Sequence, residues 1–216
     1  MSHRIITIDG PAGAGKTTVS RLLANELGCV RVDTGALYRG VAYEIIQQNI
    51  DWQNDEILSA FLATLDLNFI LTKEEPRLVS FGKEITPHIR TPQITMLASA
   101  TSARPAVRSA LLDLQRSIAQ VQDAVFEGRD MGTVVFPDAT VKFFLFADLT
   151  VRARRRFDEI QDTEKEFSRV RQQMEKRDTD DATRAQAPLK PASDAIHIDA
   201  SYLTARQVVD KMRKFL

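Results

Sequence analysis

The sequence predicts an α/β fold in which helices cover both faces of a parallel sheet, giving three layers. Short β-type runs alternate with longer helical patterns along the 216 residues, which is typical of parallel strands joined by crossover helices. Hydrophobic residues make up 44% of the chain, enough for a continuous core. The length favours a single domain, residues 1–216, with inserted segments. The expected strands are residues 5–8, 29–32, 124–126, 141–146 and 195–198.

Apolar positions recur at helical spacing in three segments, and each segment is expected to bury one face. The last of them opens with the capping-box pattern Thr204-x-x-Gln207. The expected buried positions are Val19, Leu22, Leu23 and Leu27 in the first segment, Val107, Leu111, Leu114, Ile118 and Val121 in the second, and Val208, Val209, Met212 and Phe215 in the third.

Two other segments interrupt the alternation of strands and helices. Residues 66–90 show apolar residues at every second position, which predicts a small antiparallel insertion. Residues 152–170 are densely charged and have few apolar anchors, which is typical of a mobile flap.

A phosphate-binding loop follows the first expected strand. Its glycines allow successive backbone N–H groups to point at phosphate oxygens, and the following helix adds its N-terminal dipole. A lysine at the seventh position would contact the β- and γ-phosphates, and the next hydroxyl would bind Mg²⁺. The residues Gly10, Pro11, Ala12, Gly13, Ala14, Gly15, Lys16 and Thr17 match the whole G-x-x-x-x-G-K-[ST] pattern.

This loop predicts nucleotide binding but not a reaction. GTPases and transport ATPases also contain it, yet the sequence has neither the N-K-x-D motif that recognises guanine nor an L-S-G-G-Q stretch. A kinase is therefore favoured over a nucleotide-dependent switch.

A second polar group follows the next expected strand. Thr34 can donate to a phosphate oxygen, Arg39 can bind the same phosphate with its planar fork, and Asp33 can hold Mg²⁺ through water. An ordinary helix start, with Asp33 or Thr34 as the N-cap, explains these residues equally well.

Charged residues gather at three further places. Arg129 and Asp130 lie on a glycine-flanked loop after the 124–126 strand, where they suit either ligand recognition or a structural salt bridge. Two of these places have residues at helical spacing, so the charged side chains of each would project from one face of a helix. The arginines of the first set suit a flap that closes over a triphosphate. These sets are Arg152, Arg155 and Arg156, and Arg177, Asp181 and Arg184.

Together these motifs resemble the bacterial cytidylate kinase family of P-loop nucleoside monophosphate kinases. The matching segments, in chain order, are D-G-P-A-G-A-G-K-T-T, D-T-G-A-L-Y-R, G-R-D-M-G-T-V-V-F-P-D-A, R-A-x-R-R, R-D-x-x-D-x-x-R and A-P-L-x-P-A-x-D-A, within residues 4–200. The resemblance implies ATP- and Mg²⁺-dependent phosphorylation of CMP or dCMP. It also implies a P-loop kinase core with an acceptor-binding subregion at about 35–105 and a lid at about 152–170. Glu127 and Thr34 depart from the family, which commonly has aspartate and serine there.

The resemblance assigns a role to each candidate residue. Residues 10–18, which include Thr18, would bind ATP, and Lys16 would act in catalysis with Arg129, Arg152, Arg155, Arg156 and Arg184. Thr17 and, through water, Asp33 would hold the metal. In the acceptor site, Thr34, Arg39, Arg129 and Arg184 would bind the phosphate, Arg177 and Asp181 the ribose, and Ser99, Arg108 and Asp130 the cytosine base.

The composition limits which binding partners and which cell compartment are expected. The formal net charge is zero, so no global field favours nucleic acid or an anionic membrane. The single cysteine, Cys29, fits a reducing compartment, and no apolar run approaches the length of a membrane span. Residues 1–8 leave no room for a signal peptide. A cytoplasmic enzyme acting on free nucleotides is expected, and the resemblance implies a monomer.

Three other functions remain open at this point. A kinase for another nucleoside monophosphate or small metabolite would contain the same phosphate loop. A nucleotide-dependent switch or binding module would bind ATP or GTP without phosphorylating an acceptor. A nucleic-acid-binding ATPase would show salt-sensitive binding to RNA or DNA.

Overall fold

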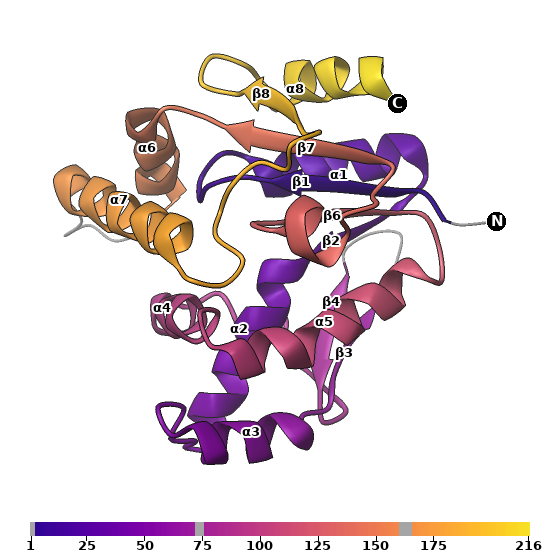
Figure 1. Ribbon diagram of the computed structural model, residues 1–216. Coiled ribbons are helices and arrows are strands. Elements are labelled where there is room, and N and C mark those ends of the chain that lie inside the picture. Colours follow the sequence, from indigo (N-terminus) through magenta and orange to yellow (C-terminus); the bar gives the residue numbers. More distant parts are fainter. Residues whose placement is uncertain (1–2, 72–75, 160–165) are drawn as a thin grey trace.

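The computed structural model describes residues 3–71, 76–159 and 166–216, and its main sheet is parallel throughout. The strand order β2–β6–β1–β7–β8 places the first strand at the centre (Figure 1). The predicted α/β class is confirmed, and where strand bounds differ from those expected they do so by one or two residues. The strands are β1 (Ile5–Asp9), β2 (Val30–Asp33), β6 (Ala124–Gly128), β7 (Val141–Phe146) and β8 (Ile196–Asp199).

Helices pack against both faces of this sheet. Ile6 and Ile8 of β1 face α1 (Lys16–Leu27) and α8 (Ala205–Met212), with which they form one core. Ile5 points to the opposite face, where the core includes the end of α5 (Pro105–Ala119) and η1 (Met131–Val135), a short π-helical turn.

A smaller unit lies below the main sheet in Figure 1. Its three-stranded antiparallel sheet confirms the predicted insertion, although residues 72–75 lie outside the described part. Leu37, Leu58 and Leu78 are fully buried in the core that this unit shares with the neighbouring helices. The elements are β3 (Leu67–Ile70), β4 (Arg77–Ser80), β5 (Lys83–Glu84), α2 (Thr34–Gln47), α3 (Asp55–Ala63) and α4 (Pro92–Thr101).

Two further helices, α6 (Leu149–Glu159) and α7 (Phe167–Thr183), pack against each other beside the phosphate loop. Ala153, Val170 and Met174 are buried between them, and Phe157 meets Phe167 edge-on with ring centroids 5.9 Å apart. In the described part of segment 152–170 the apolar residues are few, as expected, but Ala153 and Val170 are buried and hold α6 against α7. Residues 160–165 of the predicted lid lie outside the described residues.

Some details of the predicted helices are confirmed and others are wrong. Thr204 and Gln207 form the expected capping box at the start of α8. Val121 is 68% exposed because α5 ends at Ala119, and Phe215 is 55% exposed because it lies in η2 (Arg213–Phe215), the 3₁₀ turn after α8. Among the described residues, no helix combines the length and hydropathy needed to cross a membrane.

Gly10 is the residue through which the phosphate loop passes beside β7. Its φ is +150°, and a Cβ atom there would lie 1.9 Å from the carbonyl oxygen of Leu145. Gly28, at the end of α1, also has a positive φ of +65°, but a Cβ atom there would meet nothing within 4 Å. Alanine at Gly28 would therefore test the cost of the backbone conformation alone, whereas alanine at Gly10 would add a steric clash.

We predict that Gly28→Ala lowers the free energy of unfolding by about 1–2 kcal/mol, the cost of a left-handed conformation. Gly10→Ala should lose a further ~1–3 kcal/mol or more because the strands must move apart. Urea unfolding followed by circular dichroism measures both. Equal losses in the two variants would contradict the close approach of Gly10 to β7.

Candidate active site

The phosphate loop joins β1 to α1 and presents uncapped helix amides. Gly13 and Gly15 have positive φ angles of 72° and 97°, which turn the chain before α1 begins at Lys16. No side chain in the described part of the protein caps the N-terminus of α1. These N–H groups and the helix dipole form a site suited to an anion.

Lys16 is folded against its own loop in this structure. Its Nζ atom donates to the carbonyl oxygens of Gly10 and Pro11, each at 2.7 Å. Burial and the positive charge of Arg129 hold the pKa of Lys16 well below its usual value, while Glu127 acts in the opposite direction. The ammonium group is thus largely removed from water, with both cations and carboxylates close to it.

Glu127, near the end of β6, links the phosphate loop to the strand beside it. Its carboxylate accepts from Thr17 Oγ1 at 3.0 Å and from Ser20 Oγ at 3.2 Å, and Arg31 Nη1 lies 2.9 Å away. Burial and the nearby Asp33 raise the pKa of Glu127, and Arg31 opposes the shift. Sequence reasoning missed the roles of Arg31 and Ser20, because which strand lies beside β6 could not be derived from the sequence.

Asp33 acts as a helix cap and as an ion-pair partner at once. Its Oδ1 accepts from the backbone N–H of Ala36 at 3.2 Å, and Arg39 Nη2 lies 2.8 Å from its Oδ2. Burial acts to raise the pKa of Asp33, but Arg39 and the other nearby arginines lower it below its usual value. The N-cap alternative is confirmed, while Thr34 instead donates to the carbonyl oxygen of Glu127 at 2.7 Å.

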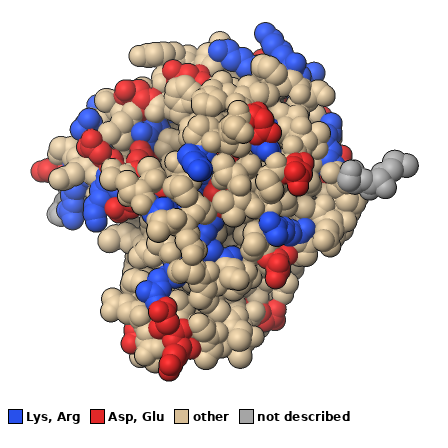
Figure 2. Space-filling view, viewed as in Figure 1, with Lys and Arg blue, Asp and Glu red and all other residues tan. Residues whose placement is uncertain are grey.

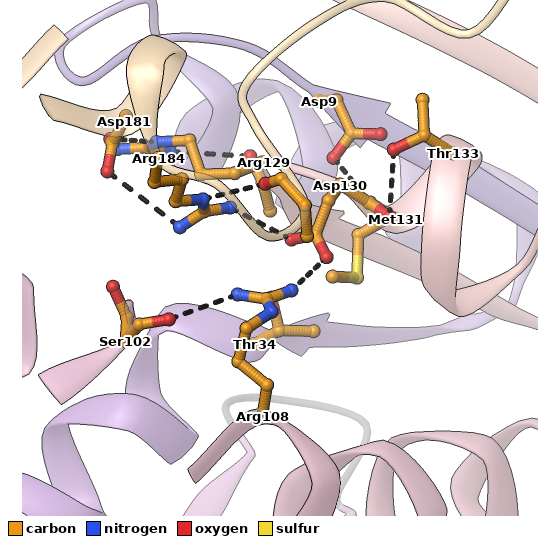
Figure 3. Close-up of polar contacts among 12 residues, drawn as sticks. Asp9, Thr34, Ser102, Arg108, Arg129, Asp130, Met131, Thr133, Asp181 and Arg184 are labelled. Atoms are coloured by element: carbon orange, nitrogen blue, oxygen red, sulfur yellow. Dashed lines mark hydrogen bonds and ion pairs between the residues drawn. The ribbon is translucent and has the colours of Figure 1, made fainter. Parts of the chain in front are cut away.

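The acceptor-side residues form one network of ion pairs (Figure 3). Arg108 Nη2 pairs with Asp130 Oδ2, and Arg184 Nη2 lies 3.5 Å from the other oxygen of the same carboxylate. Arg129 Nε donates to Asp181 Oδ2 at 2.9 Å, and Arg184 is 4.0 Å from Asp181 Oδ1. The structure therefore brings these five predicted site residues together.

Asp130 and Asp181 respond differently to this environment. Burial raises the pKa of Asp130, against the influence of Arg108 and Arg184. Burial acts on Asp181 in the same direction, but Arg129 and Arg177 hold its pKa below the usual value. Both carboxylates are thus buried beside arginines. The structural salt bridges considered for Arg129 and Asp130 are present, but the two residues do not pair with each other: Arg129 pairs with Asp181, and Asp130 pairs with Arg108.

Arg177 lies at the same network without a complete set of partners. Its Nε atom is buried and has no hydrogen-bond partner among the described residues. Burial and the charge of Arg129 lower the pKa of Arg177 to about 10. Arg177 and Asp181 both belong to α7, as predicted, but Arg184 lies just after the helix, which ends at Thr183.

Ser99 lies on α4, where its carbonyl oxygen accepts from Ser102 Oγ at 2.8 Å. Arg108 Nη1 donates to the carbonyl oxygen of Ser102 at 3.4 Å, and its guanidinium lies over the ring of Tyr38 with 5.7 Å to the centroid. Arg108 therefore contacts the residue that follows α4 and the Tyr38 ring of α2 while it pairs with Asp130.

The arginines of α6 separate into two kinds. Arg152 is buried, with Nη1 donating to the carbonyl oxygen of Ala12 at 3.1 Å, and Arg155 Nη1 lies 3.5 Å from that of Ala14. Arg156 is exposed and pairs with Glu159 at 3.1 Å. All three lie on α6 with the expected spacing, but only the first two contact the phosphate loop.

Basic side chains occupy the hollow between the main-sheet body and the smaller unit (Figure 2). Together with a phosphate loop at the carboxyl end of a central parallel strand, the fold and this site define a P-loop kinase core. A solved shikimate kinase from Bacteroides thetaiotaomicron has the same fold, with a TM-score of 0.51 and 14% identity over 98% of this chain and 97% of that chain.

Sequence comparison identifies the family. The cytidylate kinase family model matches residues 6–216. The curated cytidylate kinase of Geobacter sulfurreducens is 43% identical over 214 residues, covering 98% of this chain and 92% of the relative. That of Pseudomonas entomophila is 42% identical over 216 residues, covering 98% and 95%. The chain therefore belongs to the cytidylate kinase family of nucleoside monophosphate kinases, as its motifs predicted.

The buried pair Arg31–Glu127 yields a test of the site's energetics. Their side chains are 6% and 4% exposed. We predict that Arg31→Met lowers the free energy of unfolding by about 3–5 kcal/mol, because it leaves a buried carboxylate without its cation. Arg31→Met combined with Glu127→Gln should recover part of the loss. Chemical denaturation measures both.

A matched control is available in the exposed pair Arg77–Glu84, whose side chains are 50% and 39% exposed and whose closest atoms are 3.4 Å apart. Arg77→Met should change stability by less than about 1 kcal/mol. If Arg31→Met and Arg77→Met lowered the free energy of unfolding by similar amounts, the buried pair would not contribute more to stability than the exposed one.

Proposed function

We propose that this protein transfers the γ-phosphoryl group of ATP, in the presence of Mg²⁺, to CMP or dCMP, giving ADP and CDP or dCDP. One observation supports this more than any other. Lys16 is buried and Arg177 is half-buried, and in each the pKa is lowered by removal from water and then by Arg129. Lys16 of the phosphate loop, Arg129 of the acceptor network and Arg177 of α7 therefore repel one another, and two anionic substrates would stabilise all three.

On the donor side, we assign residues 10–18 to ATP. The free amides at the start of α1 suit the phosphates. The ammonium group of Lys16 would exchange the carbonyl oxygens of Gly10 and Pro11 for β- and γ-phosphate oxygens. Arg152 and Arg155, which already contact the loop from α6, would neutralise charge on the moving phosphoryl group. Arg156 would have to turn from Glu159 to share that role.

The residues near Thr17 fit a magnesium ion that is also bound by substrate phosphates. Among the described residues, no cluster of three or more His, Cys, Asp or Glu side chains forms a metal site by itself. Magnesium commonly takes one or two protein oxygen ligands and completes its shell with phosphates and water. Thr17 would bind it directly, with Asp33 acting through water, and the ion would neutralise phosphate charge.

On the acceptor side, we assign the phosphate of CMP to Thr34, Arg39, Arg129 and Arg184, and the ribose to Arg177 and Asp181. Cytosine offers two acceptors, O2 and N3, and one amino donor on its pairing edge. Arg108 and Ser99 would donate to the acceptors, and Asp130 would accept from the amino group. Uracil reverses the N3 and C4 groups, and each buried mismatch costs about 1–3 kcal/mol.

Catalysis would rest on positioning and charge neutralisation. The acceptor oxygen is already anionic at neutral pH, so no general base is needed. We propose that the subregion at 35–105 and the lid at 152–170 close over both substrates within one domain, which would exclude water and prevent ATP hydrolysis. The protein would act as a cytoplasmic monomer on free nucleotides, without nucleic-acid or membrane partners.

An acceptor panel tests the proposed substrate. With ATP and Mg²⁺, we expect rapid formation of CDP and dCDP, and a kcat/KM for UMP lower by about 10-fold or more because of the mismatches. AMP, GMP and shikimate should react far more slowly. Coupled detection of ADP measures all of them. Preferential phosphorylation of another acceptor would replace CMP in this proposal, and nucleotide binding without any phosphorylation would favour a switch or binding module.

Lys16→Ala should lower kcat by about 100-fold or more, because the transition state loses a preorganised cation. The matched control is Lys83→Ala, on the exposed strand β5 of the small sheet. Steady-state kinetics with CMP and ATP compares the two variants. Near-normal turnover in Lys16→Ala would overturn the role assigned to Lys16.

A further inference from the structure

Asp9 is a buried carboxylate that none of the proposed substrate contacts uses. It is the last residue of β1, directly before Gly10, and is 4% exposed. Its Oδ1 accepts from the backbone N–H of Met131 at 2.9 Å, and its Oδ2 accepts from that of Gly132 at 2.7 Å. Figure 3 shows Asp9 beside Met131. Each carboxylate oxygen therefore holds one amide of a loop that is distant in sequence.

An ionised carboxylate at this buried position costs free energy of folding. Burial raises the pKa of Asp9 to about 6, and the charge of Asp130 acts in the same direction, while the two amides and Lys16 oppose the shift. At neutral pH the group is ionised in an environment that favours its neutral form. A residue chosen only for packing would avoid this cost.

The two amides that Asp9 binds directly follow two residues of the acceptor network. Arg129 and Asp130 precede Met131 and Gly132, which open η1. Fixing these amides fixes where the chain leaves β6, and so where the Arg129 and Asp130 side chains point.

The far end of the same loop is held by cations. Arg116 Nε donates to the carbonyl oxygen of Val135 at 3.2 Å, and Lys142 Nζ donates to that of Pro137. Asp9 is the anchor at the end that faces the substrates. It is also covalently joined to the phosphate loop, so one residue sets the donor loop and the acceptor loop relative to each other.

We propose that Asp9 is a positioning residue for acceptor selection, which holds Arg129 and Asp130 in register with the phosphate loop through the amides of Met131 and Gly132. The assignment of the acceptor as CMP rests on the proposed function, whereas the holding of the loop does not.

Two nearly isosteric substitutions on one face of β1 separate this role from packing. In Asp9→Asn, one side-chain oxygen becomes an NH₂ group, which would face a backbone N–H and lose that hydrogen bond. Thr7→Val is the matched control. Thr7 is fully buried, its Oγ1 has no hydrogen-bond partner in the described part of the chain, and it lies beside Gly132.

Kinetics with both acceptors gives the first readout. Asp9→Asn should raise KM for CMP by about 10-fold, as expected for the loss of one buried hydrogen bond, and should reduce the preference for CMP over UMP. Its KM for ATP should stay within about twofold of that of the unsubstituted protein, and Thr7→Val should change none of these values. Unchanged KM and preference in Asp9→Asn, or equal losses for CMP, UMP and ATP, would overturn the proposal.

Hydrogen–deuterium exchange gives a second readout that needs no activity. The peptide containing residues 129–135 should exchange faster in Asp9→Asn than in Thr7→Val or the unsubstituted protein. Equal exchange in all three would overturn the proposal. If the unsubstituted protein formed no CDP, the proposed function would fail, and this exchange experiment alone would still decide whether Asp9 holds the loop.

Discussion

Charge burial at the carboxyl edge of the main sheet is the constraint on which the rest of the structure depends. Asp9 and Asp33 end β1 and β2, and Glu127 lies beside Asp33 in the pairing of β2 with β6. Parallel strands bring their carboxyl ends to one edge, so side chains distant in sequence must share one poorly hydrated region. Such charges are tolerated only where cations or N–H groups compensate them.

Each buried carboxylate is compensated by a different set of partners. Asp33 caps α2 and orients Arg39, while Glu127 ties the phosphate loop to Arg31. Asp130 and Asp181 hold Arg108, Arg129 and Arg184 near one another, which costs less than leaving those arginines unpaired. In the proposed function, Lys16, Arg129 and Arg184 are the cations that would contact substrate phosphates. Preorganisation of this kind lowers the reorganisation needed when a transition state forms.

Much of the fold, and the gathering of the candidate site residues, could be predicted because the strands, helices and motifs depend on local patterns. The glycine spacing of the phosphate loop, the alternation of strands and helices, and the capping box at Thr204 each leave a signature within a few residues. The partners could not be predicted, because Arg31 meets Glu127 only once β2 lies beside β6. Asp9 gave no signal of its own, since its partners are backbone amides, and Arg156 shares its spacing with Arg152 but is exposed at the surface.

A crystal structure with CMP and a non-hydrolysable ATP analogue tests most directly whether this compensated edge is a site for two phosphates. The account predicts that Lys16 leaves the carbonyl oxygens of Gly10 and Pro11 for the analogue's phosphates, and that Arg129 and Arg184 contact the phosphate of CMP. A complex in which Lys16 keeps its loop contacts, or in which CMP binds away from Asp130, would contradict it.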